Sequence, residues 1–164
     1  MSLQLRSLTP SDDAGLAAII RQVLTEYGAN RPGFAWADPE LDRLSQVYSH
    51  PNHHYLVALW QGELVGGAGF APFPCEHDRV CELQKMYLLP EARGKGIGRA
   101  LLDALISSAS AAGYRHCYLE TFGPMSQAQG LYLSRGFEPL SAPWGESGHN
   151  ACDRWYARRL ELAR

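Results

Sequence analysis

The chain has 164 residues, of which 46% are hydrophobic and 20% charged, and its formal net charge is −2. This balance is typical of a globular domain, and at this length we expect residues 1–164 to form a single domain. The slight acidic excess is unlike the basic surplus of a nucleic-acid-binding domain, so we expect no nucleic-acid partner.

No stretch approaches the roughly 18 apolar residues of a membrane span, and the N-terminal segment lacks the apolar centre of a signal peptide. Cys75, Cys81, Cys117 and Cys152 have no paired short spacing, which favours reduced thiols over a disulfide framework. The stretch around His77 offers too few ligands for a structural zinc site. We therefore expect a cytoplasmic protein with neither metal nor membrane partner.

In chain order, residues 2–9 predict a first strand, because Leu3, Leu5 and Leu8 alternate loosely with polar residues. A helix follows in residues 9–28, with a Thr or Ser cap, acidic residues in its first turn and apolar residues at helical spacing. After it we expect a loop in residues 29–37 and a short helix from Pro39 to Tyr48.

Two further strands, residues 54–60 and 63–73, flank Gln61-Gly62, a dipeptide typical of a tight hairpin turn. Pro90 ends the next strand, residues 80–89. The remaining predicted elements are a helix at 97–110, a strand at 114–122, a helix at 126–134 capped by Gly136, and strands at 137–140 and 153–162. The order β-α-α-β-β-β-α-β-α-β-β predicts a mixed α/β sheet.

Residues 93–99, "RGKGIGR", place three glycines and three cations directly before a helical pattern. The P-loop spacing fails here, and the dinucleotide fingerprint fails because Arg99 stands where a third glycine is required. The spacing R-x-x-G-x-G is met by Arg93, Gly96 and Gly98. Bare amides at a helix N-terminus, with cations around them, form a receptor for a diphosphate.

Two motifs in this order resemble the GNAT superfamily of acyl-coenzyme A-dependent N-acyltransferases. "ELQKMYLLPEARGKGIGRALL" is similar to the family's central motif, and "YLETF…AQGLYLSRGFEPL" to its second one. The resemblance covers about residues 80–140. It implies a mixed, mostly antiparallel sheet of six to seven strands flanked by about four helices.

The resemblance also implies a site for acetyl-CoA, the co-substrate of the family. Loop amides would hold the pyrophosphate, and backbone groups of the preceding strand would pair with the pantetheine arm. A frequent asparagine of the second motif is Met125 here, so Ser126 or Gln127 would replace its hydrogen bond. The cofactor-binding residues carried over are Met86, Tyr87, Leu88, Arg93, Gly94, Lys95, Gly96, Ile97, Gly98, Arg99 and Gln127.

Catalysis needs an acid and a base. In the family a tyrosine at the position of Tyr132 often protonates the departing thiolate, and a phenol has a suitable pKa for that step. An acceptor amine must lose a proton before it attacks a thioester. Glu120, in a predicted central strand, is the first candidate for the base, Glu82 is the second, and a water relay to either stays open.

Acceptor recognition is expected from the first helices and from the loop before the last strand. The candidates are Glu26, Tyr27, Arg31, Phe34, Trp36, Trp144 and His149. Aromatic groups with one or two charges suit a small polar amine or an amino acid. The same aromatic residues could instead form a small core over the sheet.

These expectations favour an N-acetyltransferase that acts on the primary amine of a small molecule or amino acid by direct attack. Two alternatives remain open: a peptide or protein N-acetyltransferase, and a module that binds acyl-CoA without turnover. The sequence leaves the acceptor's identity and the oligomeric state open, a homodimer included.

Overall fold

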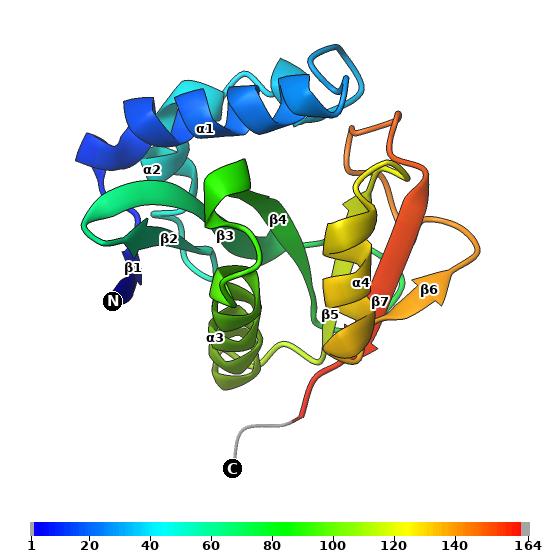
Figure 1. The fold of residues 1–164 in the computed structure, drawn as a ribbon. Helices are drawn as coiled ribbons and strands as arrows, with labels where there is room; N and C mark the ends of the chain where they lie inside the picture. The colour runs from blue at the N-terminus through cyan, green and yellow to red at the C-terminus, as the bar shows by residue number, and fades with distance from the viewer. Residues whose placement is uncertain (1, 162–164) are drawn as a thin grey trace.

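The computed structural model describes residues 2–161, which form one seven-stranded sheet in the order β1-β2-β3-β4-β5-β7-β6 (Figure 1). The strands are β1 (Leu3–Ser7), β2 (His54–Trp60), β3 (Glu63–Pro72), β4 (Val80–Leu88), β5 (His116–Thr121), β6 (Glu138–Leu140) and β7 (Arg154–Arg159). All neighbouring strands are antiparallel except β4 and β5. The mixed, mostly antiparallel sheet is confirmed; the predicted end of the last strand, residue 162, lies outside the described residues.

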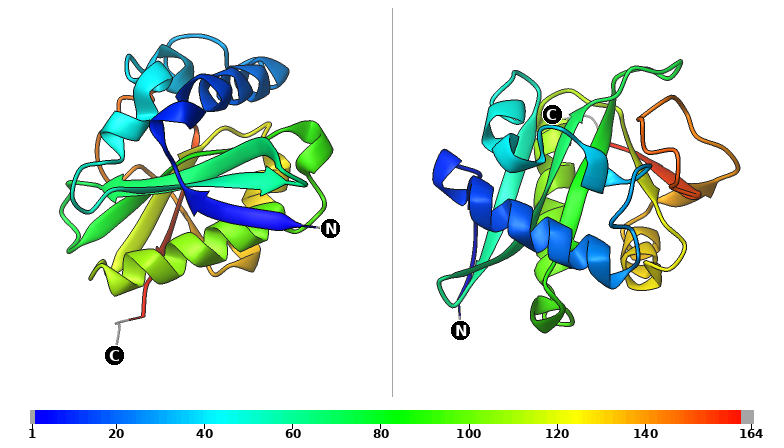
Figure 2. Two further views of the ribbon diagram at one scale, coloured as in Figure 1. Left: turned by 90° about the vertical axis from the view of Figure 1, so that its left-hand side faces the viewer. Right: turned by 90° about the horizontal axis from the view of Figure 1, so that it is seen from above.

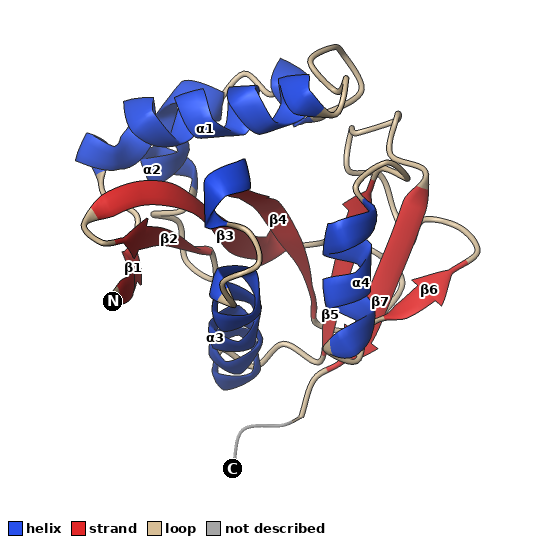
Figure 3. Ribbon diagram, viewed as in Figure 1, coloured by secondary structure: helices blue, strands red, loops and turns tan. Residues whose placement is uncertain are grey.

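Helices cover both faces of the sheet (Figures 2 and 3). The helices are α1 (Asp13–Glu26), α2 (Leu44–Val47), α3 (Ile97–Ala111) and α4 (Ser126–Ser134), and α1 and α2 lie on the opposite face from α3. Side chains of α3 and α4 share one buried cluster, which places these two helices on the same face. No helix within residues 2–161 is long and apolar enough to cross a membrane.

The expected helix from Pro39 to Tyr48 is shorter than predicted. A 3-10 turn at Leu41–Arg43 is followed by the single turn of α2, because Arg43 has a non-helical backbone (φ −141°, ψ 42°) between them. Leu41 and Leu44 are nonetheless buried beside α1. Burial of these two side chains, and not the continuity of a helix, accounts for the apolar pattern there.

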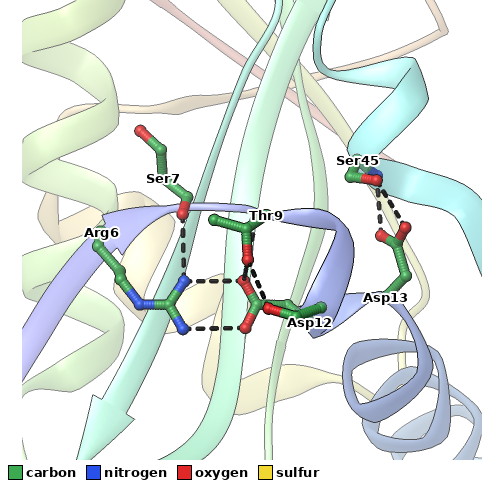
Figure 4. A network of polar contacts seen from close by, with 7 residues as sticks. Arg6, Ser7, Thr9, Asp12, Asp13 and Ser45 are labelled. Atoms are coloured by element: carbon green, nitrogen blue, oxygen red, sulfur yellow. Dashed lines mark hydrogen bonds and ion pairs between the residues drawn. The ribbon is translucent and has the colours of Figure 1, made fainter.

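A polar network at the start of α1 attaches this helix to β1 (Figure 4). The Arg6 guanidinium donates two hydrogen bonds to the Asp12 carboxylate (2.8 and 2.9 Å), and the Thr9 N–H donates to the same carboxylate (2.9 Å). Asp12 is buried, and the Arg6 bond lowers its pKa to about 2. The predicted Thr cap therefore donates to the buried carboxylate of a partly buried ion pair at the start of α1.

The glycines of β3 accommodate an aromatic ring. A Cβ at Gly67 or Gly69 would lie 2.6 or 2.5 Å from the Tyr55 ring and 2.5 Å from a β2 carbonyl, so neither position has room for a side chain. The Tyr55 hydroxyl reaches across to donate to the Lys85 carbonyl (2.8 Å). The stretch "GGAG" thus serves packing inside the sheet.

Strand β4 changes direction at Lys85. The register against β3 shifts between Gly67 and Gly69, and Lys85 takes the left-handed conformation (φ +50°), as in a β-bulge. On its other edge, β4 pairs with β5 only from Val80 to Glu82. Beyond Glu82 the two parallel strands diverge, which opens the cleft where the candidate site lies.

Candidate active site

The loop before α3 leaves its backbone open. Gly94 (φ +75°) and Gly96 (φ +80°) have left-handed conformations, and a Cβ at either would meet no atom within 4 Å. Gly96 is the N-cap of α3, a helix of 15 residues whose first amides have no partner within the helix. A ligand can therefore approach the main chain closely here, at the positive end of the helix dipole.

A cleft of about 220 Å³ runs from this loop along β4 and α4. It is lined by Val23, Tyr27, Met86, Tyr87, Leu88, Ala92, Arg93, Gly94, Gly96, Ile97, Gly98, Arg99, Met125, Gln127, Ala128 and Leu131. Ten of the eleven residues predicted to bind the cofactor are in this set. The exception is Lys95, an exposed residue of the same loop.

Arg93 connects the loop to α1. Its guanidinium donates to both Glu26 oxygens (2.7 and 2.9 Å) and to the Leu88 carbonyl (3.0 and 3.2 Å), and it lies over the Tyr27 ring. Its amide donates to the Pro90 carbonyl. Glu26 and Tyr27, expected at the acceptor, therefore lie beside the glycine loop, where they contact Arg93.

A second cavity, of about 80 Å³, lies where β4 and β5 have separated. It shares Met86, Tyr87, Met125 and Ala128 with the first cleft, so the two adjoin. All three predicted catalytic residues line it: Glu82, Glu120 and Tyr132. The divergence of two strands thus brings together residues from three elements.

Glu82 lines the second cavity and is 7% exposed. Burial raises its pKa to about 7, and the nearby Glu120 charge adds to the effect, although the Gln84 amide donates to it (2.7 Å). A carboxyl group with this pKa exchanges a proton easily at neutral pH. Glu82 therefore has the protonation behaviour required of a general base.

Glu120 is half-buried and is held by two hydroxyl groups. The Tyr118 hydroxyl donates to one oxygen (2.6 Å), and the Ser147 hydroxyl donates to the other. The two hydrogen bonds hold the carboxylate in a fixed position. This arrangement suits the binding of a cationic amine.

Tyr132 is 5% exposed, and burial raises its pKa above the ordinary value of 10, so it stays protonated at neutral pH. Its neighbour Tyr156 donates its hydroxyl to Gln129 (3.2 Å), whereas the Tyr132 hydroxyl has no acceptor among residues 2–161. The proton of Tyr132 is therefore available to a group that enters the cavity.

Two charged residues of this region, Lys85 and Asp38, were not among the predicted site residues, whereas their neighbour His149 was. Lys85, at the bulge, donates to Asp38 (2.6 Å), and His149 Nε2 lies 2.9 and 3.1 Å from the two oxygens of the same carboxylate. Lys85 and His149 both line the second cavity. The only signal for Lys85 was its place between Glu82 and the glycine loop, because a single lysine in a strand has no motif.

Two of the residues expected to contact the acceptor, Phe34 and His149, line the second cavity. Arg31 lies over the Phe34 ring at 5.4 Å, and Trp36 packs in the cluster beneath α1. Trp144 lies outside this cavity, where its ring stacks on Tyr118 and on His77 (centroids 5.5 and 3.9 Å apart). Within residues 2–161, no three His, Cys, Asp or Glu side chains gather as metal ligands would.

Comparison with known proteins decides the family. Residues 19–137 match the model of the acetyltransferase (GNAT) family. The chain belongs to this family. The match includes the glycine loop, both strands of the cleft and Tyr132, so the GNAT resemblance read from the two motifs is confirmed.

Similar GNAT proteins are N-acetyltransferases. The N-acetyltransferase YjgM of Escherichia coli is 43% identical over 95% of this chain and 94% of its own length. The aminoalkylphosphonate N-acetyltransferase of Salmonella typhimurium is 33% identical over 82% of this chain and 84% of its own length. This GNAT protein is accordingly an acyltransferase enzyme.

A solved structure shows a cofactor in a similar GNAT fold. The phosphinothricin acetyltransferase of Sinorhizobium meliloti, in complex with AcCoA, has a TM-score of 0.77 and 26% identity. The alignment covers 98% of this chain and 89% of that one. GNAT relatives thus bind acetyl-CoA.

Proposed function

We propose that this GNAT enzyme transfers the acetyl group of acetyl-CoA to the primary amine of a small molecule or amino acid, by direct attack of the amine. The observation that carries the proposal is that the two cavities adjoin and share four wall residues. An open glycine loop at a helix N-terminus leads, through shared wall residues, to a cavity that contains Glu82, Glu120 and Tyr132.

The residues of the first cleft fit acetyl-CoA. Gly94 and Gly96 leave room at the backbone for a diphosphate, and Arg99 and Lys95 add exposed positive charge beside it. Beyond Glu82, the edge of β4 that faces β5 has no ladder partner among the described residues, so Met86 and Tyr87 have backbone groups free for the pantetheine arm. When bound, acetyl-CoA supplies an acetyl thioester.

The residues of the second cavity supply the proton transfers. Glu82 accepts the proton of the acceptor amine, directly or through water, since its pKa near 7 lets it act as a base at neutral pH. Glu120 holds the amine by charge. Tyr132, still protonated, gives its proton to the leaving thiolate.

Cys152 also lines the second cavity but is unsuited to act as a nucleophile. Burial raises the pKa of its thiol to about 12, and the nearby Glu120 and Glu82 charges add to the effect. The thiol therefore stays protonated at neutral pH, while the thiolate is the reactive form. This supports direct transfer without a covalent intermediate on the enzyme.

The small volume of the second cavity favours a small acceptor over a peptide. The names of two relatives, aminoalkylphosphonate N-acetyltransferase and phosphinothricin acetyltransferase, point to small substrates as well. The two alternatives, a peptide N-acetyltransferase and an acyl-CoA-binding module without turnover, are tested by the following assay.

The test is a thiol-release assay with acetyl-CoA across amino acids, other small amines and peptides. We expect release with small amines only. Release with peptides alone would support the peptide alternative, and tight CoA binding without release would support the binding module.

A pair of glycine variants tests the phosphate end. Gly96→Ala should raise the KM for acetyl-CoA about tenfold or more, because a methyl group strains the left-handed backbone and approaches the phosphates. Gly113→Ala is the matched control: Gly113 is also left-handed (φ +94°) with no atom within 4 Å, but it lies at the far end of α3. It should leave this KM unchanged.

A further inference from the structure

Lys85 and His149 line the second cavity and both contact Asp38, and the three residues come from three separate segments. Lys85 comes from the bulge of β4, Asp38 from the segment between α1 and α2, and His149 from the loop between β6 and β7. The side chains of Lys85 and Asp38 are 6% and 16% exposed, and that of His149 is 24% exposed. A cationic side chain this deeply enclosed needs a partner, because burial disfavours its charge.

Asp38 accepts only some of the hydrogen bonds that Lys85 and His149 can donate. An ammonium group has three N–H donors and a protonated imidazole has two. Within residues 2–161, the one acceptor of Lys85 Nζ is Asp38, at 2.6 Å, and His149 Nδ1 has none. Donors therefore remain at the cavity wall after the ion pair is formed.

The charges of the trio do not cancel. Burial lowers the pKa of His149, but the hydrogen bond and charge of Asp38 outweigh it and raise this pKa above 6.5. With His149 protonated, two positive charges face a single carboxylate. The trio then has an excess positive charge next to the unused donors, and Glu82 of the same cavity interacts with both cations.

Glu82 and Glu120 give the same cavity a negative side. Glu82 precedes Lys85 by three residues on β4, and Glu120 lies on β5. The lining therefore combines carboxylates from β4 and β5 with two cationic side chains, Lys85 from the bulge of β4 and His149 from the loop between β6 and β7. A ligand with only a positive charge would leave the donors of the trio unpaired.

We propose that the acceptor is a zwitterion, whose amine binds at Glu82 and Glu120 and whose anionic group, a carboxylate or phosphonate, binds Lys85 and His149. This inference rests on the proposed function and adds the substrate class. Lys85 and His149 are then residues that determine specificity. Asp38 is a positioning residue that holds both of them at the cavity.

The test compares matched acceptors that differ in the anionic group alone. Each amino acid is assayed against its own amide, and an aminoalkylphosphonate against the amino alcohol of the same chain length. Loss of a neighbouring carboxylate lowers the pKa of the amine and so makes the amide the better nucleophile at neutral pH. A preference for the zwitterion therefore reports on binding.

In kcat/KM, the parent enzyme should prefer one zwitterion over its uncharged partner by about tenfold or more, since hydrogen bonds between charged groups are strong. The amino acid and its amide test for a carboxylate, and the aminoalkylphosphonate and its amino alcohol test for a phosphonate, so the two comparisons show which anion the enzyme uses. Lys85→Gln should reduce the preference to about threefold or less by raising the acceptor KM, with the KM for acetyl-CoA unchanged. His149→Gln should reduce the preference for the zwitterion partly. This second variant tests the inference even if Lys85→Gln does not fold.

Arg21→Gln is the control, because it removes an exposed cation that pairs with Asp42 outside both cavities. Its preference should equal that of the parent. Calorimetric titration of the same acceptor pairs in the presence of CoA gives a second readout that is independent of turnover.

Equal use of both partners by the parent enzyme, or an undiminished preference in both the Lys85 and His149 variants, would overturn the inference. Either result still leaves an active acetyltransferase. Absence of thiol release with every amine would instead overturn the proposed function and the inference together.

Discussion

Burial changes the proton affinity of two cavity side chains in the direction that their proposed roles require. Glu82 would be a weaker base with an ordinary pKa of 4.5, and Tyr132 would be a less reliable proton carrier if it ionised easily. Both are buried and line the second cavity, where protein replaces most of the surrounding water. One structural feature therefore adjusts both residues.

Tyr132→Phe removes the proposed acid and keeps the ring. We expect kcat to fall about 100-fold, the usual scale of general acid catalysis, with little change in the KM for acetyl-CoA. Steady-state kinetics measures both. Tyr156→Phe is the matched control, since its ring lies 6.2 Å from that of Tyr132 in the same buried cluster, and it should keep most of the activity.

Glu82→Gln tests the base through the pH profile. A carboxylate base acts when ionised, so kcat/KM of the parent should rise with pH and level off above about 7. Glu82→Gln should lower kcat/KM and lose this inflection, whereas Glu120→Gln should weaken acceptor binding and keep it. The opposite pattern, with the inflection lost only in Glu120→Gln, would make Glu120 the base.

Glu82→Gln should also change the stability of the fold. Because folding raises the pKa of Glu82 from 4.5 to about 7, ionised Glu82 costs stability increasingly between these values and fully above 7. Glu82→Gln should therefore be more stable than the parent at pH 8, by up to about 3 kcal/mol. Below pH 4.5 the difference should vanish. Urea unfolding at the two pH values measures it.

At the scale of elements, the segment between β6 and β7 supports β5 from outside the cavity. Trp144 stacks on Tyr118, and Tyr118 stacks on Phe73 (4.6 Å) while its hydroxyl donates to Glu120. Ser147 of the same segment donates to Glu120 from the other side. Trp144 thus positions Glu120 indirectly, although it was expected to contact the acceptor.

Trp144→Ala should lower kcat/KM for the acceptor about tenfold by releasing Tyr118, and leave the KM for acetyl-CoA unchanged. Trp144→Phe, which keeps a ring for stacking, should restore most of the loss. Trp60→Ala removes a half-buried tryptophan from β2 and should reduce stability without this kinetic effect. An equal loss in both alanine variants would indicate a general loss of folding.

At the scale of the whole molecule, the first segments of the chain must stay attached to the sheet for the cavity to keep its wall. Val23 of α1 and its C-cap residue Tyr27 line the first cleft, and Asp38 follows shortly after them. The Arg6–Asp12 pair holds the start of α1 against β1 (Figure 4). Its strength therefore bears on the stability of the fold and on the shape of the site.

Asp12→Asn should reduce the free energy of unfolding by about 2 kcal/mol at pH 7, since the pKa of Asp12 falls from 3.8 to about 2 on folding. A lowered pKa stabilises the fold above 3.8, and this contribution is lost as the pH falls toward 2. The difference between parent and variant should therefore shrink below pH 4. Urea titrations from pH 7 down to pH 3 measure it.

Asp42→Asn is the control for this pair. Arg21 donates two hydrogen bonds to Asp42 at similar distances (2.7 and 2.8 Å), but the Asp42 side chain is 69% exposed. Exposed ion pairs contribute little. The stability of this variant should match that of the parent across the same pH range.

The local elements could be predicted because neighbouring residues set them. The apolar spacing of α1 and α3, the turn at Gln61-Gly62 and the R-x-x-G-x-G loop depend on residues close together in the chain. The broken helix at Arg43 and the bulge at Lys85 could not be predicted. The bulge, for instance, depends on the hydroxyl of Tyr55, thirty residues away.

The sequence by itself determined the fold class, the GNAT family and the glycine loop at the start of α3, because all three are recorded in short-range patterns. Tertiary structure decided the composition of the second cavity: that Glu82 is the buried carboxylate, that Lys85 and His149 share Asp38, and that Trp144 lies outside. The physical reason is that burial and charge depend on which segments meet. That meeting is set by the divergence of β4 and β5, which no local pattern contains.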